Sequence, residues 1–327
     1  MKTTPTCPRG LILQITVNRL TIETLMDQVN QTACPAARTG WQTLLTYGRM
    51  VKFSHSVFAL PFALAAVILA QRQAPLQWFD LVWILIAMVS ARSAAMGFNR
   101  MVDARLDGQN PRTQNREIPT GQISMTAAGG FVLASTLIFL LMAWLLGRIC
   151  FIIAFPVLAI LMVYSYTKRF TWSSHLILGL AIALAPPGAW LAVAKSFNGA
   201  ILWLSLALLT HIAGFDILYA CQDYDFDKKS GLRSIPTCFG IKRALGIAKG
   251  IHVISFIALV MVALVFQLHW PYLVSVVIIG GLLIVEHKLV SPDDLSRVHV
   301  AFFHINSIIA CVLFTGIFLD EVWRWTV

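Results

Sequence analysis

The sequence predicts an all-α membrane protein with nine transmembrane helices. Of its 327 residues, 58% are hydrophobic and only 12% are charged, and the mean hydropathy is +0.75. A soluble domain, by contrast, carries roughly a quarter charged residues. Apolar stretches of about 17 to 25 residues, the length needed to cross a hydrocarbon core of roughly 30 Å, recur along the chain after residue 50. These two observations place most of the chain in lipid.

We expect the nine spans at residues 54–71, 78–98, 123–146, 149–166, 175–194, 200–220, 247–267, 270–286 and 300–319. The eighth stretch, whose apolar run ends at Glu286, is short, so it could tilt less than the others or lie partly against protein rather than lipid. Prolines fall inside three of the spans, where neighbouring helices can satisfy the carbonyls that a proline leaves free. We therefore expect kinks, not breaks, at Pro61, Pro156, Pro186 and Pro187.

Basic residues are divided unequally between the two sets of loops. Of the 25 lysine and arginine residues, 20 lie at the N-terminus or in loops on one side, four lie on the other side, and Arg92 lies inside a span. Lys and Arg near span ends stay on the cytoplasmic side, which predicts a cytoplasmic N-terminus. The net charge of +10 needs no nucleic acid partner, because topology and lipid headgroups explain it.

Two regions are expected, residues 1–45 and residues 46–327. The apolar stretch within residues 11–17 is interrupted by Gln14 and is too short for the core of a signal peptide. We interpret residues 1–45 as a peripheral or disordered N-terminal extension. A native start further along the chain, near Met26 or Met50, is the alternative. Residues 46–327 form the nine-helix intramembrane domain.

The first of two aspartate-rich segments follows the second span. Asn99, Asp103 and Asp107 are spaced by four residues, so a helix that continues out of the span places them on one face. Arg92 falls on the same face, inside the span, where an unpaired charge is costly. We therefore expect a polar stripe on which Arg92 pairs with Asn99 or with an aspartate.

The second aspartate-rich segment follows the sixth span. Asp216, Asp223 and Asp227 are spaced by seven and four residues, again consistent with one face of a continuing helix. A carboxylate at the centre of a membrane helix costs about 2.5 to 3.5 kcal/mol on insertion scales, so acidic residues near spans usually face a wet cavity. Both segments lie on the side predicted to be cytoplasmic. We expect them to meet in one cavity there.

Carboxylates that converge on a cavity need cations. Two unit charges roughly 5 Å apart repel by about 3 kcal/mol at an effective dielectric constant of 20. Mg²⁺ and Mn²⁺ accept hard oxygen ligands, and Mg²⁺ commonly bridges carboxylates to substrate phosphates. The predicted metal ligands are Asp103, Asp107, Asp223 and Asp227. The basic residues expected to contact phosphate oxygens are Arg112, Arg116, Lys168, Arg169, Lys228, Lys229 and Arg233.

These residues resemble the motifs of the UbiA superfamily of intramembrane aromatic prenyltransferases. Residues 99–107 and 112–116 are similar to the family's first motif, NDxxDxxxD followed by RTxxRP. Residues 223–227 are similar to the second motif, DxxxD, and residues 164–168 are similar to the family's YxxxK. The resemblance covers the chain from about residue 45 to its end. It implies the UbiA-type fold, with nine helices around a cavity open to lipid.

Two positions depart from the usual pattern of the family. Arg100 stands where the family usually has Asp, and Glu117 stands where it usually has Pro. With residues 52–64 and 91–100, these positions look like a bacterial branch labelled 4-hydroxybenzoate polyprenyltransferase-like, which is often linked to the futalosine route to menaquinone. The resemblance therefore implies a bacterial cytoplasmic (inner) membrane, with the acceptor left open.

The resemblance implies Mg²⁺-dependent transfer of a polyprenyl group from a polyprenyl diphosphate to a small aromatic acceptor in quinone biosynthesis. The acceptor would resemble 4-hydroxybenzoate or a menaquinone intermediate, with a haem-type or chlorophyll-type acceptor as the alternative. The predicted catalytic residues are Asn99 and Asp216, which would orient the ring, steady the cation or take the ring proton, and Lys168 and Arg116, which would neutralise phosphate oxygens. The predicted substrate-binding residues are Arg112, Arg116, Tyr164, Lys168, Arg49, Lys52 and Tyr219.

Some of these assignments have a structural alternative. Arg49 and Lys52 would bind an acceptor carboxylate, or would only extend to lipid headgroups. Six aromatic residues could line the conduit for the isoprenoid tail and steady a cation, although helix packing is the more common role of such residues. They are Phe58, Phe62, Trp83, Tyr164, Phe215 and Tyr219.

Two other classes of membrane protein also use acidic residues. Secondary transporters and channels place their site near the middle of the membrane on broken helices, whereas the aspartates here gather at one face. A CDP-alcohol phosphotransferase keeps its acids in one contiguous motif, which the Asp103 to Asp107 segment does not continue. The position of the aspartates at one face therefore argues against the first class, and the large separation between the two aspartate segments argues against the second.

Overall fold

The computed structural model describes residues 40–326, and the chain divides into two compact units, residues 1–47 and residues 48–327. The predicted extension falls almost wholly on residues 1–39, outside the described part. Its character and the alternative start at Met26 therefore stay predictions.

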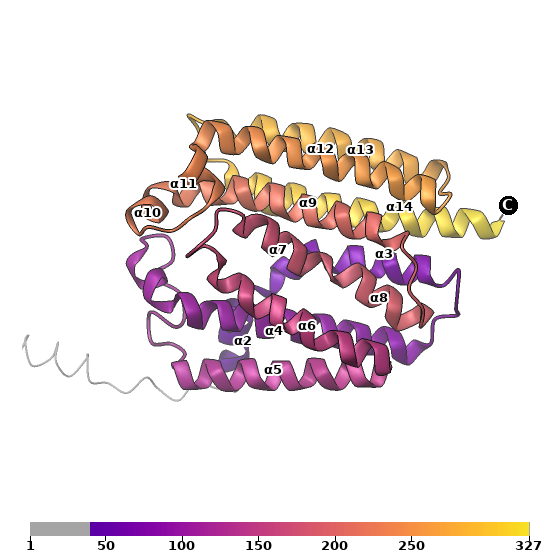
Figure 1. Cartoon of the computed structure of the whole chain (residues 1–327), viewed down its shortest axis with the longest axis horizontal. Helices are drawn as coiled ribbons and strands as arrows, with labels where there is room; N and C mark the ends of the chain where they lie inside the picture. Colours follow the sequence, from indigo (N-terminus) through magenta and orange to yellow (C-terminus); the bar gives the residue numbers. More distant parts are fainter. Residues whose placement is uncertain (1–39, 327) are drawn as a thin grey trace, which may run out of the picture. The chain divides into compact units, whose positions relative to one another are not determined.

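The part of the chain that the structure describes is helical and contains no strand. In Figure 1 the long helices of the second unit run side by side, and α10 and α11 lie at the end of the bundle away from the C-terminus. The elements are α2 (Gly40–Met50), η1 (Phe53–Phe58), α3 (Leu60–Ala70), α4 (Trp78–Gln109), α5 (Met125–Leu146), α6 (Arg148–Thr167), α7 (Ser174–Ala183), α8 (Ala185–Ala194), α9 (Ile201–Ala220), η2 (Cys221–Asp223), α10 (Tyr224–Lys229), α11 (Ile235–Phe239), α12 (Ile241–Val265), α13 (Trp270–Leu289), η3 (Val300–Ile305) and α14 (Asn306–Thr326).

Eight helical segments within residues 40–326 are long and apolar enough to cross a membrane. The predicted all-α, multi-pass membrane fold is confirmed. The predicted first span corresponds to a shorter apolar helix, Ser56–Ala70. At a rise of about 1.5 Å per residue it covers only about 22 Å, less than the hydrocarbon core. The number nine therefore holds only if this short helix is included.

The prediction that the eighth span is short was wrong. α13 runs over 20 residues and is one of the eight segments that could cross a membrane. The apolar run stops at Glu286, but this carboxylate is buried and accepts a hydrogen bond from Asn306 Nδ2 at 3.0 Å. The helix therefore continues through the acidic residue to Leu289.

Three of the four prolines mark the starts of helices rather than kinks. Pro61 lies in the first turn of α3, and Pro186 and Pro187 lie in the first turn of α8. The first turn has no intrahelical acceptor for its N–H groups, so proline is tolerated there. The predicted span 175–194 is accordingly divided into α7 and α8 at Leu184. Only Pro156 lies inside a helix, α6.

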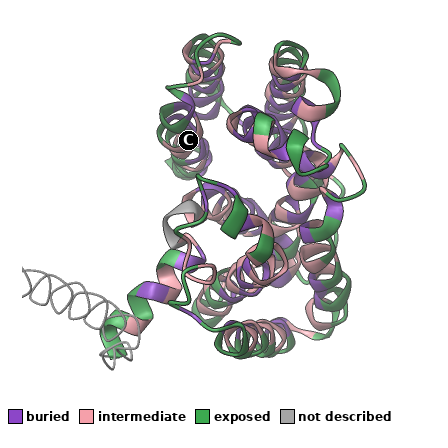
Figure 2. Cartoon of the chain, turned by 90° about the vertical axis from the view of Figure 1, so that its left-hand side faces the viewer, coloured by how far each residue is buried: buried purple, intermediate pink, exposed green. Residues whose placement is uncertain are grey.

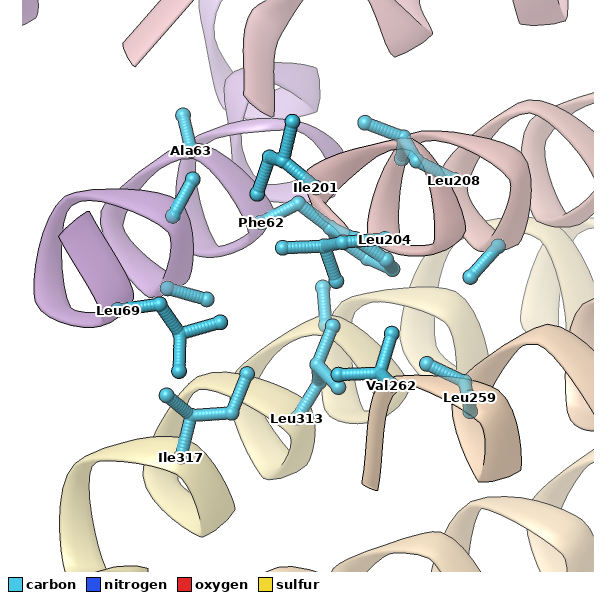
Figure 3. Close-up of a cluster of buried hydrophobic side chains, with 14 of the residues drawn as sticks. Phe62, Ala63, Leu69, Ile201, Leu204, Leu208, Leu259, Val262, Leu313 and Ile317 are labelled. Atoms are coloured by element: carbon cyan, nitrogen blue, oxygen red, sulfur yellow. The ribbon is translucent and has the colours of Figure 1, made fainter. Parts of the chain in front are cut away.

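The largest apolar core joins α3, α9, α12 and α14. Figure 3 shows Phe62, Leu204, Val262 and Leu313 pointing toward one another from these four helices. The outer face is also apolar, with Leu133, for example, largely exposed. In the end-on view of Figure 2, exposed segments cover much of the outside, and buried segments face neighbouring helices. Helices that are apolar on every side are typical of membrane spans.

A close contact between α7 and α9 sets the position of one wall of the site described below. A Cβ atom added at Gly179 would overlap the backbone carbonyl of Leu209 and would lie 3.3 Å from Ala213 Cβ. Because a backbone carbonyl inside a packed helix cannot move aside, only glycine allows the two helices to approach this closely.

We expect the Gly179→Ala variant to be destabilised by about 1 to 3 kcal/mol, the usual cost of overpacking a close contact. The measurement is the thermal unfolding midpoint of the purified protein in detergent. Gly250→Ala in α12 is the matched control, because a Cβ there meets no atom within 4 Å. Equal midpoints for the two variants would contradict the close approach of α7 and α9.

Candidate functional site

A polar cavity of about 250 Å³ lies where the ends of α4, α6 and α9 meet. It is lined by residues from the predicted site, from both aspartate segments and from the loops that follow them. The predicted residues that line it are Lys52, Asn99, Asp103, Asp107, Arg112, Arg116, Tyr164, Lys168, Arg169, Asp216, Tyr219, Asp223 and Asp227. The predicted phosphate contacts Lys228, Lys229 and Arg233 do not line it. Arg49 is exposed and is not among the lining residues, so the structure does not place it with the others.

The first aspartate segment forms the predicted stripe. α4 continues without interruption to Gln109, and Asn99, Asp103 and Asp107 all face the cavity from it. Asn99 Nδ2 donates a hydrogen bond to Asp103 Oδ2 at 3.0 Å. The helical spacing alone was sufficient to predict this arrangement, because four residues return the chain to the same face.

The prediction for Arg92 was wrong. This residue lines the cavity, but its Nη2 donates to the backbone carbonyl of Lys52 at 3.2 Å rather than to Asn99 or to an aspartate. Lys52 has a left-handed backbone conformation, with φ of 46°, at the start of η1. This backbone conformation directs the Lys52 carbonyl toward Arg92, so that it can accept a hydrogen bond from the buried guanidinium.

The second aspartate segment is not one continuous helix. α9 ends at Ala220, and a single 3-10 turn, η2, joins it to the short α10. A 3-10 turn has three residues per turn instead of 3.6, so the predicted helical register is not kept. Asp216, Asp223 and Asp227 nevertheless reach the same cavity.

Arginines compensate three of the aspartates. Arg116 Nη1 lies 2.6 Å from both carboxylate oxygens of Asp107, and Arg169 Nη2 lies 3.3 Å from Asp103 Oδ1. Arg116 was expected to bind phosphate, and in this structure it binds a carboxylate instead. Because these guanidinium groups lie beside the aspartates, they reduce the repulsion among the carboxylates.

Arg112 connects the two aspartate segments. Its Nε donates to Asp223 Oδ1 at 2.8 Å, its Nη1 donates to Tyr219 Oη at 2.7 Å, and its guanidinium lies 5.0 Å from the centre of the Tyr219 ring. Asn110 Nδ2 donates to the same Asp223 oxygen at 3.2 Å. Burial lowers the pKa of Arg112, but the bonds to Asp223 outweigh it and raise the pKa. The loop after α4 is thereby tied to η2.

Lys168 lies among the carboxylates. Burial lowers its pKa, but the nearby charges of Asp227, Asp216, Asp223 and Asp103 outweigh burial and raise the pKa above the ordinary value. Lys168 is therefore fully protonated at neutral pH. Its backbone carbonyl also accepts a hydrogen bond from the Arg233 amide at 2.7 Å, which holds the end of α6 near the second aspartate segment.

The donor atoms suit a divalent cation. All four predicted ligands line one cavity and offer only oxygen, the ligand that Mg²⁺ prefers. Asp227 Oδ2 is buried and has no hydrogen-bond partner within the described residues. Within residues 40–326, however, no three His, Cys, Asp or Glu side chains are close enough together to hold a metal ion. Three of the four predicted ligands, Asp103, Asp107 and Asp223, are instead paired with arginines.

Lys52 lies on the side of the cavity beside Arg100. Burial and the neighbouring charges of Arg100, Arg116 and Arg112 lower its pKa from 10.5 to about 8. Arg100 is itself buried and donates from Nε to the Met50 carbonyl at 3.1 Å. This part of the cavity therefore has an excess of positive charge.

Aromatic rings form another wall of the cavity, and two of them, Phe58 and Phe215, also pack in the apolar core. Phe58, Phe215 and Tyr219 line the cavity, whereas Phe62 lies in the core. Phe302, from the π-helix η3, also lines it, with its ring centre 4.3 Å from that of Tyr219 and 5.1 Å from that of Phe215. Trp83 packs against the core and does not line the cavity.

Sequence reasoning missed Phe302, Asn110 and His175. The hydrogen bond of Asn110 to Asp223 and the ring contacts of Phe302 join residues far apart in the chain. His175 Nδ1 lies 2.6 Å from Asp216 Oδ2. The one available signal for His175 was a histidine six residues after Arg169, at the first position of the predicted span 175–194.

A second, apolar cavity of about 230 Å³ adjoins the polar one. Arg92, Met96, Tyr164, Leu178 and Ile182 line both cavities. The rest of its wall is mainly small or aliphatic, from α4, α5, α6 and α8. A ligand with a charged head and an apolar tail could therefore occupy both cavities at once.

Comparison with known proteins agrees with this arrangement. Residues 59–308 match the model of the UbiA prenyltransferase family. The chain is 27% identical over 241 residues to 4-hydroxybenzoate octaprenyltransferase of Escherichia fergusonii, which covers 72% of this chain and 82% of that protein. It is 28% identical over 245 residues to the enzyme of the same name from Saccharophagus degradans, with 75% and 81% covered.

Solved structures share the fold. The apo structure of a UbiA homolog from Aeropyrum pernix K1 has a TM-score of 0.75 and 29% identity, and the match covers 82% of this chain and 98% of that one. A UbiA homolog from Archaeoglobus fulgidus, bound to GPP and Mg²⁺, has a TM-score of 0.60 and 22% identity, with 83% and 99% covered.

Proposed function

This chain belongs to the UbiA prenyltransferase family, and we propose that it transfers a polyprenyl group from a polyprenyl diphosphate to a small aromatic acceptor, with Mg²⁺ as cofactor. One observation carries the proposal. A cavity with five aspartates and several basic side chains adjoins an apolar cavity through shared lining residues. Such a pair of cavities suits a ligand with a diphosphate head and an isoprenoid tail. The fold shared with a homolog bound to GPP and Mg²⁺ supports this reading.

The diphosphate would bind among Arg112, Arg116, Lys168 and Arg169. Asp103, Asp107, Asp223 and Asp227 would hold Mg²⁺, which supplies positive charge where the diphosphate leaves. Lys168 carries its charge at neutral pH and adds to this stabilisation. The arginines already lie at the cavity in ion pairs with aspartates, so they can exchange a carboxylate for a phosphate oxygen without leaving it.

The acceptor would bind between the aspartates and the positively charged side of the cavity. Lys52 would bind a carboxylate on the acceptor, and Asn99 would orient the ring. The C–O bond of the donor breaks, and the ring carbon attacks the allylic cation. The ring proton then passes to Asp216, and the C–H electron pair restores aromaticity. Phe215, Tyr219 and Phe302 present ring faces that can steady the cation.

The acceptor is proposed to be 4-hydroxybenzoate or an aromatic intermediate of menaquinone synthesis, because the relatives include 4-hydroxybenzoate octaprenyltransferases. The family match sets aside the transporter and CDP-alcohol phosphotransferase hypotheses. A deletion strain should lack its quinone and accumulate the unprenylated aromatic acid, identified by mass spectrometry. Accumulation of a haem or chlorophyll precursor would instead support the alternative acceptors.

The chain is a multi-pass membrane protein, and we propose the bacterial cytoplasmic membrane with the N-terminus and both aspartate segments in the cytoplasm. The support is the unequal distribution of Lys and Arg between the two sets of loops. This orientation would give the active site access to water-soluble acceptors made in the cytoplasm.

We expect Asp103→Ala and Asp223→Ala each to lower prenyl transfer by about 100-fold or more, because each removes a charge from the site where the diphosphate leaves. The measurement is transfer in isolated membranes with added Mg²⁺. Asp294→Ala, at an exposed position outside the cavity, is the matched control and should stay active. Wild-type turnover by either cavity variant would refute the assignment.

The activity toward a carboxylated acceptor should fall as the pH rises above about 8, because Lys52 loses its charge there. Lys52→Gln should lower kcat/KM by about 10- to 100-fold below pH 8, the effect of losing one charged hydrogen bond. The decrease of kcat/KM above about pH 8 should be absent in this variant. Lys52→Arg should keep the charge and move the fall to higher pH. The measurement is the pH profile of kcat/KM, with an acceptor lacking the carboxylate as control. Superimposable profiles of wild type and Lys52→Gln would exclude the role.

The apolar cavity should accept the isoprenoid tail. Gly188 lines it, and a Cβ added there meets no atom within 4 Å. We therefore expect Gly188→Phe to fold and to fill part of the cavity. The ratio of activity with an eight-unit donor to activity with a two-unit donor should then fall by about tenfold or more. Gly130→Phe, which has equal space but lies outside the cavity, should show no change in this ratio. An unchanged ratio for Gly188→Phe would place the tail elsewhere.

A further inference from the structure

A buried histidine lies directly behind Asp216. His175, at the start of α7, is completely inaccessible, and its Nδ1 lies 2.6 Å from Asp216 Oδ2. Asp216 is about one fifth exposed and lines the polar cavity, whereas His175 does not line it. The histidine therefore cannot touch a substrate and can act only through the carboxylate.

The hydrogen bonds of His175 favour one of its two neutral tautomers. Its Nε2 is buried and has no hydrogen-bond partner within the described residues. A proton on Nε2 would leave an unpaired N–H in the interior, which is costly. The favoured neutral tautomer therefore carries its proton on Nδ1, which donates it in the hydrogen bond to Asp216, and has no proton on Nε2. A neutral donor of this kind favours the ionised form of the carboxylate.

The fold holds this pair rigidly. His175 lies one helical turn before Gly179, where α7 approaches α9 so closely that no side chain would fit. Asp216 lies on the facing helix, α9, three residues after Ala213, whose Cβ would lie 3.3 Å from a Cβ added at Gly179. The two helices therefore fix the distance between the imidazole and the carboxylate. With Oδ2 held by His175, Asp216 Oδ1 is the oxygen that can meet a bound acceptor.

We propose that His175 is a positioning residue that aims Asp216 at the acceptor ring and keeps it ionised until the ring proton arrives. The role rests on the proposed function. In the step concerned, the C–H bond of the cationic ring intermediate breaks, its electrons restore the aromatic ring, and the proton ends on Asp216 Oδ1. His175 keeps its own proton throughout, as an orienting partner of a catalytic acid or base does.

Two substitutions separate the hydrogen bond from the bulk of the side chain. In His175→Asn, the amide Nδ2 can occupy the position of the imidazole Nδ1 and donate to Asp216. His175→Leu keeps volume but has no donor. A matched control uses another histidine next to an aspartate, His269, whose Nδ1 lies 3.4 Å from Asp320 Oδ1 and which does not line the cavity. His269→Leu tests whether the loss of a histidine–aspartate contact elsewhere in the protein lowers activity as much as His175→Leu does.

The experiment measures kcat and KM of the full-length protein in membranes, with normal and ring-deuterated 4-hydroxybenzoate. For His175→Leu we expect kcat to fall about 10- to 100-fold, at the lower end of general base contributions, with an unchanged KM for the donor. The deuterium isotope effect on kcat should rise, because loss of the ring proton becomes slower. His175→Asn should keep kcat within about threefold of wild type, and His269→Leu should match wild type. In the double variant, His175→Leu should lower kcat no further than Asp216→Asn alone, because His175 acts only through Asp216.

Three results would overturn the role of His175 while leaving the proposed function intact. They are a His175→Leu variant with wild-type kcat, a His175→Asn variant as impaired as His175→Leu, and a loss of kcat without any rise in the isotope effect. Wild-type membranes that transfer no prenyl group to an aromatic ring would overturn the proposed function, and with it this role. Elution of His175→Leu as a monodisperse peak in detergent, together with an unchanged KM for the donor, distinguishes a loss of activity in the folded protein from unfolding.

Discussion

Charge compensation around the aspartates is the interaction on which the rest of the site depends. Two unit charges 4 Å apart interact by about 4 kcal/mol at an effective dielectric constant of 20, so several carboxylates in a mostly apolar chain need cations close by. Asp107, Asp223 and Asp103 each pair with an arginine. Lys168, whose pKa the carboxylates raise, adds a positive charge near Asp216 and Asp227.

These ion pairs also determine the shape of the cavity. Arg112 and Arg116 lie on the loop between α4 and α5, and they bind one aspartate from η2 and one from α4. The loop is thus held over the cavity by the same contacts that stabilise the aspartates. Removing one partner would leave a half-buried charge uncompensated, which is costly, so the loop and the aspartates form one structural unit.

Polarity changes sharply from one cavity to the next. The polar cavity contains the charged residues, and the adjoining apolar cavity is lined almost entirely by aliphatic and small side chains. Arg92 and Tyr164 lie where the two meet. The guanidinium of Arg92 bonds to the Lys52 carbonyl, and this backbone acceptor makes an aspartate in the apolar part unnecessary. The boundary between the cavities can therefore separate a charged head from an apolar tail.

The sequence alone determined what depends on local spacing and composition. Hydropathy predicted the membrane helices, a step of four residues predicted the stripe of Asn99, Asp103 and Asp107 on α4, and the motifs predicted the family. The tertiary structure decided which distant groups meet. It turned Arg92 to the Lys52 carbonyl, left Arg49 outside the cavity and brought His175 to Asp216. Periodicity shows which residues share a face of one helix, but contacts between helices depend on packing, such as the close approach at Gly179, which spacing along the chain does not contain.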